Sequence, residues 1–146
     1  MLFRSADAVA KIFLDQLLAN GTTSALAFCT VHRGSAEALF EAALARNMRL
    51  VAGKVLMDRE APTGLTDTVE SGRADTEALI RAYRGKGRLG YAVTPRFAVT
   101  SSDAQLAMAG ELLAAHPAVL LHTHMSENRA EIARVGELFQ IGRAHV

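Results

Sequence analysis

Residues 102–125 read SDAQLAMAGELLAAHPAVLLHTHM, and this stretch combines the two periodicities that decide the fold. Ser102 and Gln105 have capping-box spacing, which predicts a helix that runs to about Ala115 and ends at His116-Pro117. The apolar run at 118–125 lacks strict alternation with polar residues, which is typical of a strand covered on both faces. The stretch therefore predicts one helix–strand unit of a parallel α/β sheet.

Strands and helices of these kinds alternate along the rest of the chain. Short apolar runs predict three further strands, at residues 22–31, 50–57 and 89–97. Helical spacing predicts further helices at residues 7–20, 35–47 and 75–84. Asn128 and Glu131 have the spacing that opens a last helix, and Gly21 provides a natural end for the first one.

Each of the first three helices has an apolar side that we expect to face the core. In the helix at 7–20 this side carries Val9, Ile12, Phe13 and Leu17. In the two helices at 35–47 and 75–84 it carries Leu39, Phe40, Ala43 and Leu44, and then Leu79, Ile80 and Tyr83.

Strand–helix alternation of this kind implies right-handed crossovers and a parallel α/β sheet. Four strands do not close a (β/α)8 TIM-type barrel, which needs about 250 residues. We therefore expect either a small open sheet or a partial (β/α)8 barrel of about four consecutive βα units. The polar connector at 58–74 is expected to be a loop, and loops of that length are often functional.

The two ends of the chain favour the partial barrel. Residues 1–5 (MLFRS) have no evident role, and residues 141–146 (IGRAHV) interrupt a running helical pattern. Both strings match translations of common sequencing-adapter DNA, so we expect residues 6–140 to be the native stretch. This interpretation removes His145 from the candidate metal ligands.

The composition excludes several classes of protein. The 146 residues are 50% apolar with a net charge of +1, which fits a globular domain and not a disordered chain. So small a charge gives no electrostatic case for a nucleic acid or an anionic membrane as partner. No apolar run approaches the ~20 residues that span a bilayer. The single cysteine, Cys29, cannot form an internal disulfide, so we expect a cytoplasmic protein.

One glycine motif has the wrong surroundings for its usual function. Residues 85–90 (GKGRLG) match the dinucleotide-binding pattern G-x-G-x-x-G. That fingerprint must follow a strand and open a helix, whereas these glycines follow a predicted helix and lead into a predicted strand. We therefore interpret them as a helix-to-strand turn.

Residues 122–128 (HTHMSEN) are the richest candidate for chemistry, because they lie where a predicted strand ends. Ligands bind at the carboxyl ends of parallel strands. His122 and His124 share one face of the strand, and Glu127 lies in the following turn. A neutral imidazole is a good Zn²⁺ ligand, and a nearby carboxylate can move a proton to and from activated water. The alternative is a core histidine beside a helix-capping glutamate.

Two other strand ends carry weaker candidates. Arg96 and Phe97 follow the strand at 89–97, where an arginine beside an aromatic face can hold a planar polar ligand. The alternative is a surface ion pair for Arg96 and a core position for Phe97. In residues 57–59 (MDR), the favoured interpretation of Asp58 is a loop carboxylate that bonds nearby backbone. Cys29 is interpreted as a small core residue and not as a nucleophile.

Taken together, four blocks resemble one family. They are GTTSALAFCTVH (21–32), FEAALARNMRLVAGKVLMDREAP (40–62), GRLGYAVTPRFAVTSSDAQL (87–106) and LLHTHMSENRAEI (120–132). These blocks resemble the guanine deaminase family of the metal-dependent amidohydrolase superfamily, over nearly all of residues 6–140. That family has a (β/α)8 barrel beside a small β domain and hydrolyses guanine to xanthine and ammonia at a Zn²⁺ centre.

The resemblance implies roles for four residues. His124 matches a metal-ligand histidine, and Glu127 matches the acid/base glutamate of the H-x-x-E turn. Arg96 and Phe97 match the pair that holds the purine. It also implies one zinc ion per active site, guanine as the small-molecule substrate, and a homodimer as the oligomer of the longer parent protein.

The chain departs from the family pattern in ways that limit its own activity. The family's H-x-H strand, its later barrel histidine, its final aspartate and its small β domain are absent, whereas a catalytic zinc needs about three protein ligands. We therefore expect the isolated chain to be inactive and prone to aggregate. Two alternatives stay open: a related amidohydrolase that acts on another aminopurine, a pterin or a triazine, and a non-catalytic α/β binding module of flavodoxin type.

Overall fold

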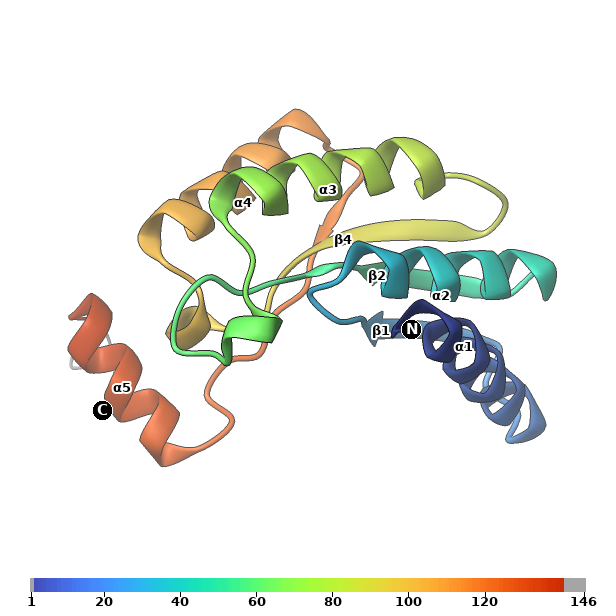
Figure 1. The fold of residues 1–146 in the computed structure, drawn as a ribbon, viewed down its shortest axis with the longest axis horizontal. Coiled ribbons are helices and arrows are strands. Elements are labelled where there is room, and N and C mark those ends of the chain that lie inside the picture. Colours follow the sequence, from blue (N-terminus) through green and yellow to red (C-terminus); the bar gives the residue numbers. More distant parts are fainter. Residues whose placement is uncertain (1, 141–146) are drawn as a thin grey trace.

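The computed structural model describes residues 2–140, with side chains from residue 5 onward. Helices and strands alternate along the chain (Figure 1), as the sequence predicts for an α/β fold. The helices are α1 (Leu2–Ala19), α2 (Arg33–Ala45), α3 (Val69–Tyr83), α4 (Asp103–Ala115) and α5 (Arg129–Phe139). The strands are β1 (Ser24–Phe28), β2 (Arg49–Gly53), β3 (Val55–Leu56), β4 (Leu89–Pro95) and β5 (Leu120–Leu121). Two 3-10 turns, η1 (Thr63–Leu65) and η2 (Ala98–Thr100), lie in the connections.

All strand pairs in the described part of the chain are parallel. β1 pairs with β2, β2 and β3 both pair with β4, and β4 pairs with β5 on its other side. β2 and β3 are two parts of the single predicted strand at 50–57, divided at Lys54. The carboxyl ends of all strands therefore lie on one edge of the sheet.

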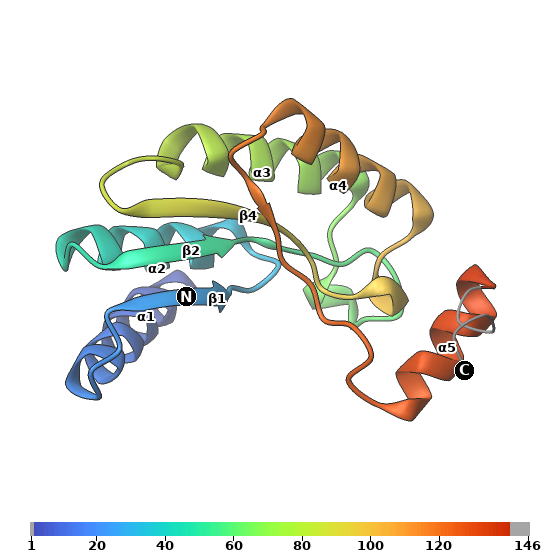
Figure 2. The same ribbon diagram turned by 180° about the vertical axis from the view of Figure 1, so that it is seen from behind.

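Helices α2, α3 and α4 cover one face of the sheet, whereas no described helix covers the other face (Figures 1 and 2). The covered face holds the core, in which the Phe40 ring stacks on Tyr83 with centroids 4.8 Å apart. The two outer strands remain open: Leu26 on β1 and Leu120 and Leu121 on β5 are each more than half exposed. This one-sided layer matches the expected partial barrel.

Several predicted boundaries were wrong, and the helix predicted at 7–20 begins at Leu2. The strand at 118–125 is regular only at Leu120–Leu121, because beyond it the chain follows β4 through single hydrogen bonds from His122 N to Val93 O and from His124 N to Arg96 O. The strand at 22–31 is shortened to Ser24–Phe28. The helix predicted at 75–84 begins at Val69, because Thr68 and Ser71 form a reciprocal capping box. The loop expected at 58–74 therefore ends at Thr68.

The apolar face predicted for the first helix was also wrong, except for Leu17, which packs partly buried against the core. α1 packs against α2 through Ala10 and Leu14, which are buried, whereas Val9, Ile12 and Phe13 are exposed. The helix has apolar residues on two sides, so spacing alone could not show which side meets α2. Neither α1 nor any other described helix is both long and apolar enough to cross a membrane. The faces predicted for α2 and α3 are confirmed, apart from Leu44, which is only half-buried.

The structure confirms the predicted turn at residues 85–90 but does not test the predictions for the two ends of the chain. Residues 85–90 form the predicted helix-to-strand turn, with Gly85 and Gly87 at φ +79° and +58° before β4 begins at Leu89. Residues 2–5 form the first turn of α1. Met1 and residues 141–146, with His145 among them, lie outside the described residues, so their proposed non-native origin stays a prediction.

A buried ion pair ties the long connector to the sheet. The Lys54 side chain, only 1% exposed, pairs its ammonium with the Asp67 carboxylate. The other Asp67 oxygen accepts hydrogen bonds from Met57 N (3.2 Å) and from Gln105 Nε2 on α4 (3.0 Å). The connector between β3 and α3 is thus fixed at its far end to both the sheet and the helix layer.

We expect Gly53→Ala to lower the free energy of unfolding by about 3 kcal/mol, because a Cβ there would overlap the main-chain oxygen of Ala92 on β4. Gly110→Ala is the matched control, since a Cβ at that helical position meets nothing within 4 Å. It should stabilise the protein by up to about 1 kcal/mol. Thermal unfolding of the full-length protein measures both effects, and equal behaviour of the two variants would contradict the close approach of β2 and β4.

Candidate active site

Three segments leave the sheet at the carboxyl edge and form the candidate site. Arg96 and Phe97 follow β4, residues 57–60 follow β3, and residues 122–127 follow β5. The sequence placed these segments at strand ends, and the parallel pairing of β3, β4 and β5 brings those ends together. The three segments therefore begin at the same edge of the sheet.

His124 is held in a defined orientation by one main-chain oxygen. The Arg96 carbonyl oxygen accepts the His124 main-chain N–H at 2.9 Å and lies 3.1 Å from the ring Nδ1. With Nδ1 as the donor of the second bond, the free lone pair of the imidazole is on Nε2. A carbonyl partner of this kind is the usual outer contact of a metal-ligating histidine. The geometry at His124 therefore fits a metal ligand.

The described residues do not complete a metal site. No group of three or more His, Cys, Asp and Glu side chains within residues 5–140 is arranged to hold a metal ion. A catalytic zinc needs about three protein ligands, so the described residues do not by themselves form such a centre.

His122 and His124 point to the same side, as their spacing predicts, and both contact Phe28. The Phe28 ring lies 3.9 Å from the His122 ring and 4.4 Å from the His124 ring, measured between centroids. His122 Nδ1 is buried without a described partner, and burial, with His124 nearby, lowers the pKa of His122. The sequence analysis did not identify Phe28 as a neighbour of the two histidines. Its position at the carboxyl end of β1 was the signal that could have indicated this.

Arg96 is exposed and free to meet a ligand. Its guanidinium carbon lies 5.3 Å from the centroid of the half-buried Phe97 ring, and Nη1 lies 3.7 Å from the Met57 sulfur. Arg96 forms no ion pair with any residue of the described range, which disfavours the surface ion pair considered from the sequence. The Arg96 guanidinium, which lies over the Phe97 ring, is therefore accessible to a ligand at the edge of the sheet.

The turn that carries Glu127 is shaped by a second glutamate. The carboxylate of Glu131, which is 7% exposed, accepts the main-chain N–H of Ser126 (2.9 Å) and of Glu127 (2.8 Å). Asn128 Oδ1 accepts the N–H of Glu131, which confirms the predicted helix start. Ser126 has φ +58°, a left-handed conformation that the turn requires. The Glu127 side chain is exposed at the edge of the site.

We expect Glu131→Gln to loosen this turn, because the amide replaces one of two acceptor oxygens with a donor that faces a main-chain N–H. Amide hydrogen exchange at Ser126 and Glu127 should speed up, by about tenfold for a loss of 1–2 kcal/mol. Glu137→Gln, on the exposed side of the same helix, is the control. Unchanged exchange at both amides in Glu131→Gln would show that the carboxylate does not hold the turn.

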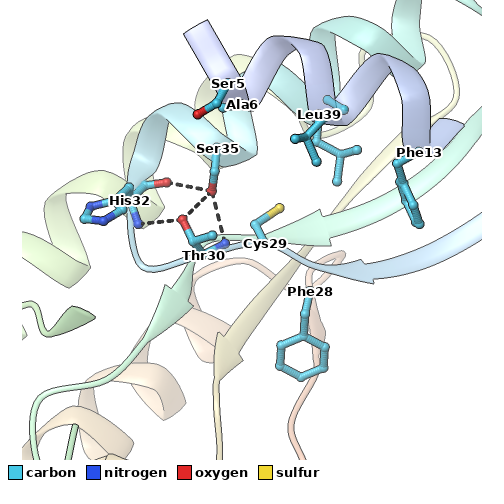
Figure 3. Close-up of a pocket in the computed structure, with 11 residues that line it drawn as sticks. Ser5, Ala6, Phe13, Phe28, Cys29, Thr30, His32, Ser35 and Leu39 are labelled. Atoms are coloured by element: carbon cyan, nitrogen blue, oxygen red, sulfur yellow. Dashed lines mark hydrogen bonds between the residues drawn. The ribbon is translucent and has the colours of Figure 1, made fainter. Parts of the chain in front are cut away.

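An apolar cavity of about 510 Å³ lies between α1, α2 and the end of β1 (Figure 3). Phe13, Phe28 and Leu39 line it, and Thr30 and Ser35 join their hydroxyls at 2.8 Å on its wall. Cys29 also faces this cavity, and burial raises the pKa of its thiol to about 12. The cysteine is therefore a neutral thiol at pH 7, in agreement with a core residue and not a nucleophile.

We expect Cys29 to resist alkylation in the folded protein. With its pKa raised to about 12, the thiolate fraction at pH 8 is about a thousandfold below that of an unfolded thiol. Iodoacetamide labelling followed by mass spectrometry should therefore be slow in buffer and fast in urea. Equal labelling rates in both conditions would contradict the burial of this thiol.

The fold and the site define a class of protein. The chain belongs to the amidohydrolase family, because the model of that family matches residues 4–146. This family membership removes the flavodoxin-type binding module from consideration.

Guanine deaminases are prominent among the relatives. The guanine deaminase of Escherichia coli (strain K12) is 53% identical over 131 residues, which cover 90% of this chain and 30% of that protein. A probable guanine deaminase of Deinococcus radiodurans is 39% identical, covering 97% of this chain and 32% of that protein. The chain thus spans about a third of the length of the relatives that it matches.

Solved structures agree with these relatives. E. coli guanine deaminase superposes with a TM-score of 0.93 at 51% identity, over 94% of this chain and 32% of that one. A C. acetobutylicum guanine deaminase with guanine bound in its active site gives a TM-score of 0.92 at 30% identity, over 97% and 34%. An Arthrobacter aurescens atrazine chlorohydrolase in complex with zinc shares the fold (TM-score 0.84, 18% identity, 95% and 33% covered). The expected partial TIM-type barrel is confirmed.

Proposed function

We propose that the full-length protein that contains this chain hydrolyses guanine to xanthine and ammonia in the cytoplasm. Relatives of that name at up to 53% identity support the proposal, and so does the guanine-bound structure of the same fold. The chain by itself, with one fitting metal ligand among the described residues, is proposed to be inactive.

A single observation carries the proposal. The Arg96 main-chain oxygen holds both the N–H and the Nδ1 of His124, so the residue proposed to bind the purine also orients the proposed metal ligand. Substrate and metal would therefore meet at the carboxyl end of β4 and β5.

His124 would hold one zinc ion through Nε2, together with ligands from elsewhere in the full-length protein. The chemistry that zinc supplies when bound is the activation of water for attack. The fit rests on the Nδ1 contact, because that bond leaves Nε2 unprotonated and fixes the ring plane. The zinc-bound chlorohydrolase of the same fold supports the choice of metal.

Glu127 would act as the proton carrier. It takes one proton from the water that attacks the ring carbon bearing the exocyclic amine, and it delivers this proton to the amine nitrogen. The C–N bond then breaks, ammonia leaves and the ring carbon keeps the oxygen of water. The Glu131 carboxylate holds the Glu127 main chain in place for both transfers.

Arg96 and Phe97 would hold the purine. The Arg96 guanidinium can donate directed hydrogen bonds to the carbonyl edge of guanine, and the Phe97 ring offers an apolar face below the cation. Adenine lacks that carbonyl and would leave the donors unpaired, which is costly in a closed site. Guanine is therefore preferred over adenine.

The test uses the full-length, zinc-loaded protein, with ammonia release from guanine and from adenine as the readout. Glu127→Gln should lower kcat by about 10²–10⁴-fold, because proton transfer by a positioned group contributes that much. His124→Ala should lower the zinc content measured by mass spectrometry. His116→Ala, at the end of α4, is the control and should leave both values unchanged. Absence of ammonia release from guanine by the unmodified protein would reject the proposed function.

A further inference from the structure

Residues Asp58, Arg59 and Glu60 connect the two halves of the candidate site. They follow β3 and contact both the turn after Phe97 and the helix after Glu127. We refer to them as the 58–60 clamp. None of the three is needed for the chemistry proposed above, so their contacts call for a separate explanation.

Asp58 fixes the segment that ends the turn after Phe97. One carboxylate oxygen accepts the Ser102 main-chain N–H at 2.7 Å, and the other accepts the Ser102 hydroxyl. In the reverse direction, the main-chain N–H groups of Asp58 and Arg59 both donate to Thr100 O, at 3.0 and 3.2 Å. The two segments are therefore joined through main chain as well as side chain.

Arg59 fixes the turn itself. Its Nε donates to Val99 O at 3.0 Å and its Nη2 donates to Ala98 O at 2.7 Å. Together with Thr100 O, all three carbonyl oxygens of η2 are bound by the clamp. η2 begins directly after Phe97, so the direction in which Arg96 and Phe97 leave β4 depends on these bonds.

The other side of the clamp contacts α5. The Arg59 guanidinium carbon lies 5.3 Å from the centroid of the Phe139 ring, and the Glu60 carboxylate forms an ion pair with Arg134. The hydrogen bond from Arg134 lowers the pKa of Glu60. Because α5 begins two residues after Glu127, these contacts relate the proton-carrying turn to the purine-holding segment.

We propose that Asp58 and Arg59 are positioning residues that set the distance between the Arg96–Phe97 pair and the Glu127 turn. The inference rests on the proposed function for its substrate. The clamp touches neither the reacting atoms nor the metal ligand, and it acts through η2 and α5. Loss of the clamp should thus weaken the binding of guanine by the Arg96–Phe97 pair, and it should also slow the chemical step because the Glu127 turn is misplaced.

The first test compares two arginine-to-lysine variants of the full-length, zinc-loaded protein. Arg59→Lys cannot donate to Ala98 O and Val99 O together, because lysine lacks the planar fork. The KM for guanine should rise about tenfold, and kcat should fall by a similar factor because the Glu127 turn is displaced from the purine. Arg49→Lys is the matched control, because Arg49 also donates to a main-chain oxygen (Arg88 O, 2.9 Å), but at the amino end of β2. An unchanged KM in Arg59→Lys, or an equal rise in Arg49→Lys, would overturn the proposal.

The second test does not depend on catalysis. Amide hydrogen exchange in Asp58→Ala and Arg59→Lys should speed up at Ser102, which Asp58 binds, and at His124, whose N–H is held by Arg96 O. Asp58→Asn retains an acceptor for the Ser102 N–H and should partly restore the slow exchange. Unchanged exchange at His124 in both clamp variants would overturn the proposal even if the protein deaminates guanine. If the protein does not deaminate guanine but exchange at His124 still speeds up in the clamp variants, the proposed function is rejected and the positioning role of the clamp is retained.

Discussion

The buried pair of Lys54 and Asp67 is the constraint on which the carboxyl edge of this sheet depends. An ammonium that is 1% exposed is tolerated only beside an opposite charge, and removal of one partner from such a pair costs about 3–5 kcal/mol. Asp67 can reach Lys54 only if the connector from Met57 folds back across the sheet. The pair therefore sets the path of the connector, and with it the position of the 58–60 clamp.

Main-chain hydrogen bonds connect this fixed connector to the residues of the candidate site. The Met57 main-chain N–H donates to the Asp67 carboxylate, and the Met57 carbonyl oxygen accepts the Asp67 main-chain N–H. The Met57 sulfur lies against the Arg96 guanidinium. Arg96 N donates to Leu56 O, and Arg96 O holds His124. Main-chain N–H and C=O groups beyond the last paired residues of a parallel strand have no partner within the sheet. Here such groups of Arg96 form hydrogen bonds with Leu56 and His124.

The sequence predicted the parallel α/β fold and placed the candidate site residues after strand ends, because strand ends and helix caps are local signals; the roles of these residues stay predictions. The start of α3 was missed, since Ser71 replaces the Glu or Gln expected in a capping box. The buried side of α1 was not predictable, because Val9 and Ala10 are both apolar and only the packing on α2 distinguishes them. Phe28, Lys54 and Asp67 act through contacts between distant segments, for which spacing along the chain carries no information.

The main chain and the side chain of Arg96 have different roles. The carbonyl orients His124, and every amino acid possesses that group, whereas only the guanidinium is proposed to select the purine. Substitution at this position could therefore change which heterocycle is accepted without disturbing the histidine. A sheet edge built in this way can acquire a new ligand preference by one point mutation, because the main-chain bond to His124 is kept whatever the side chain of residue 96.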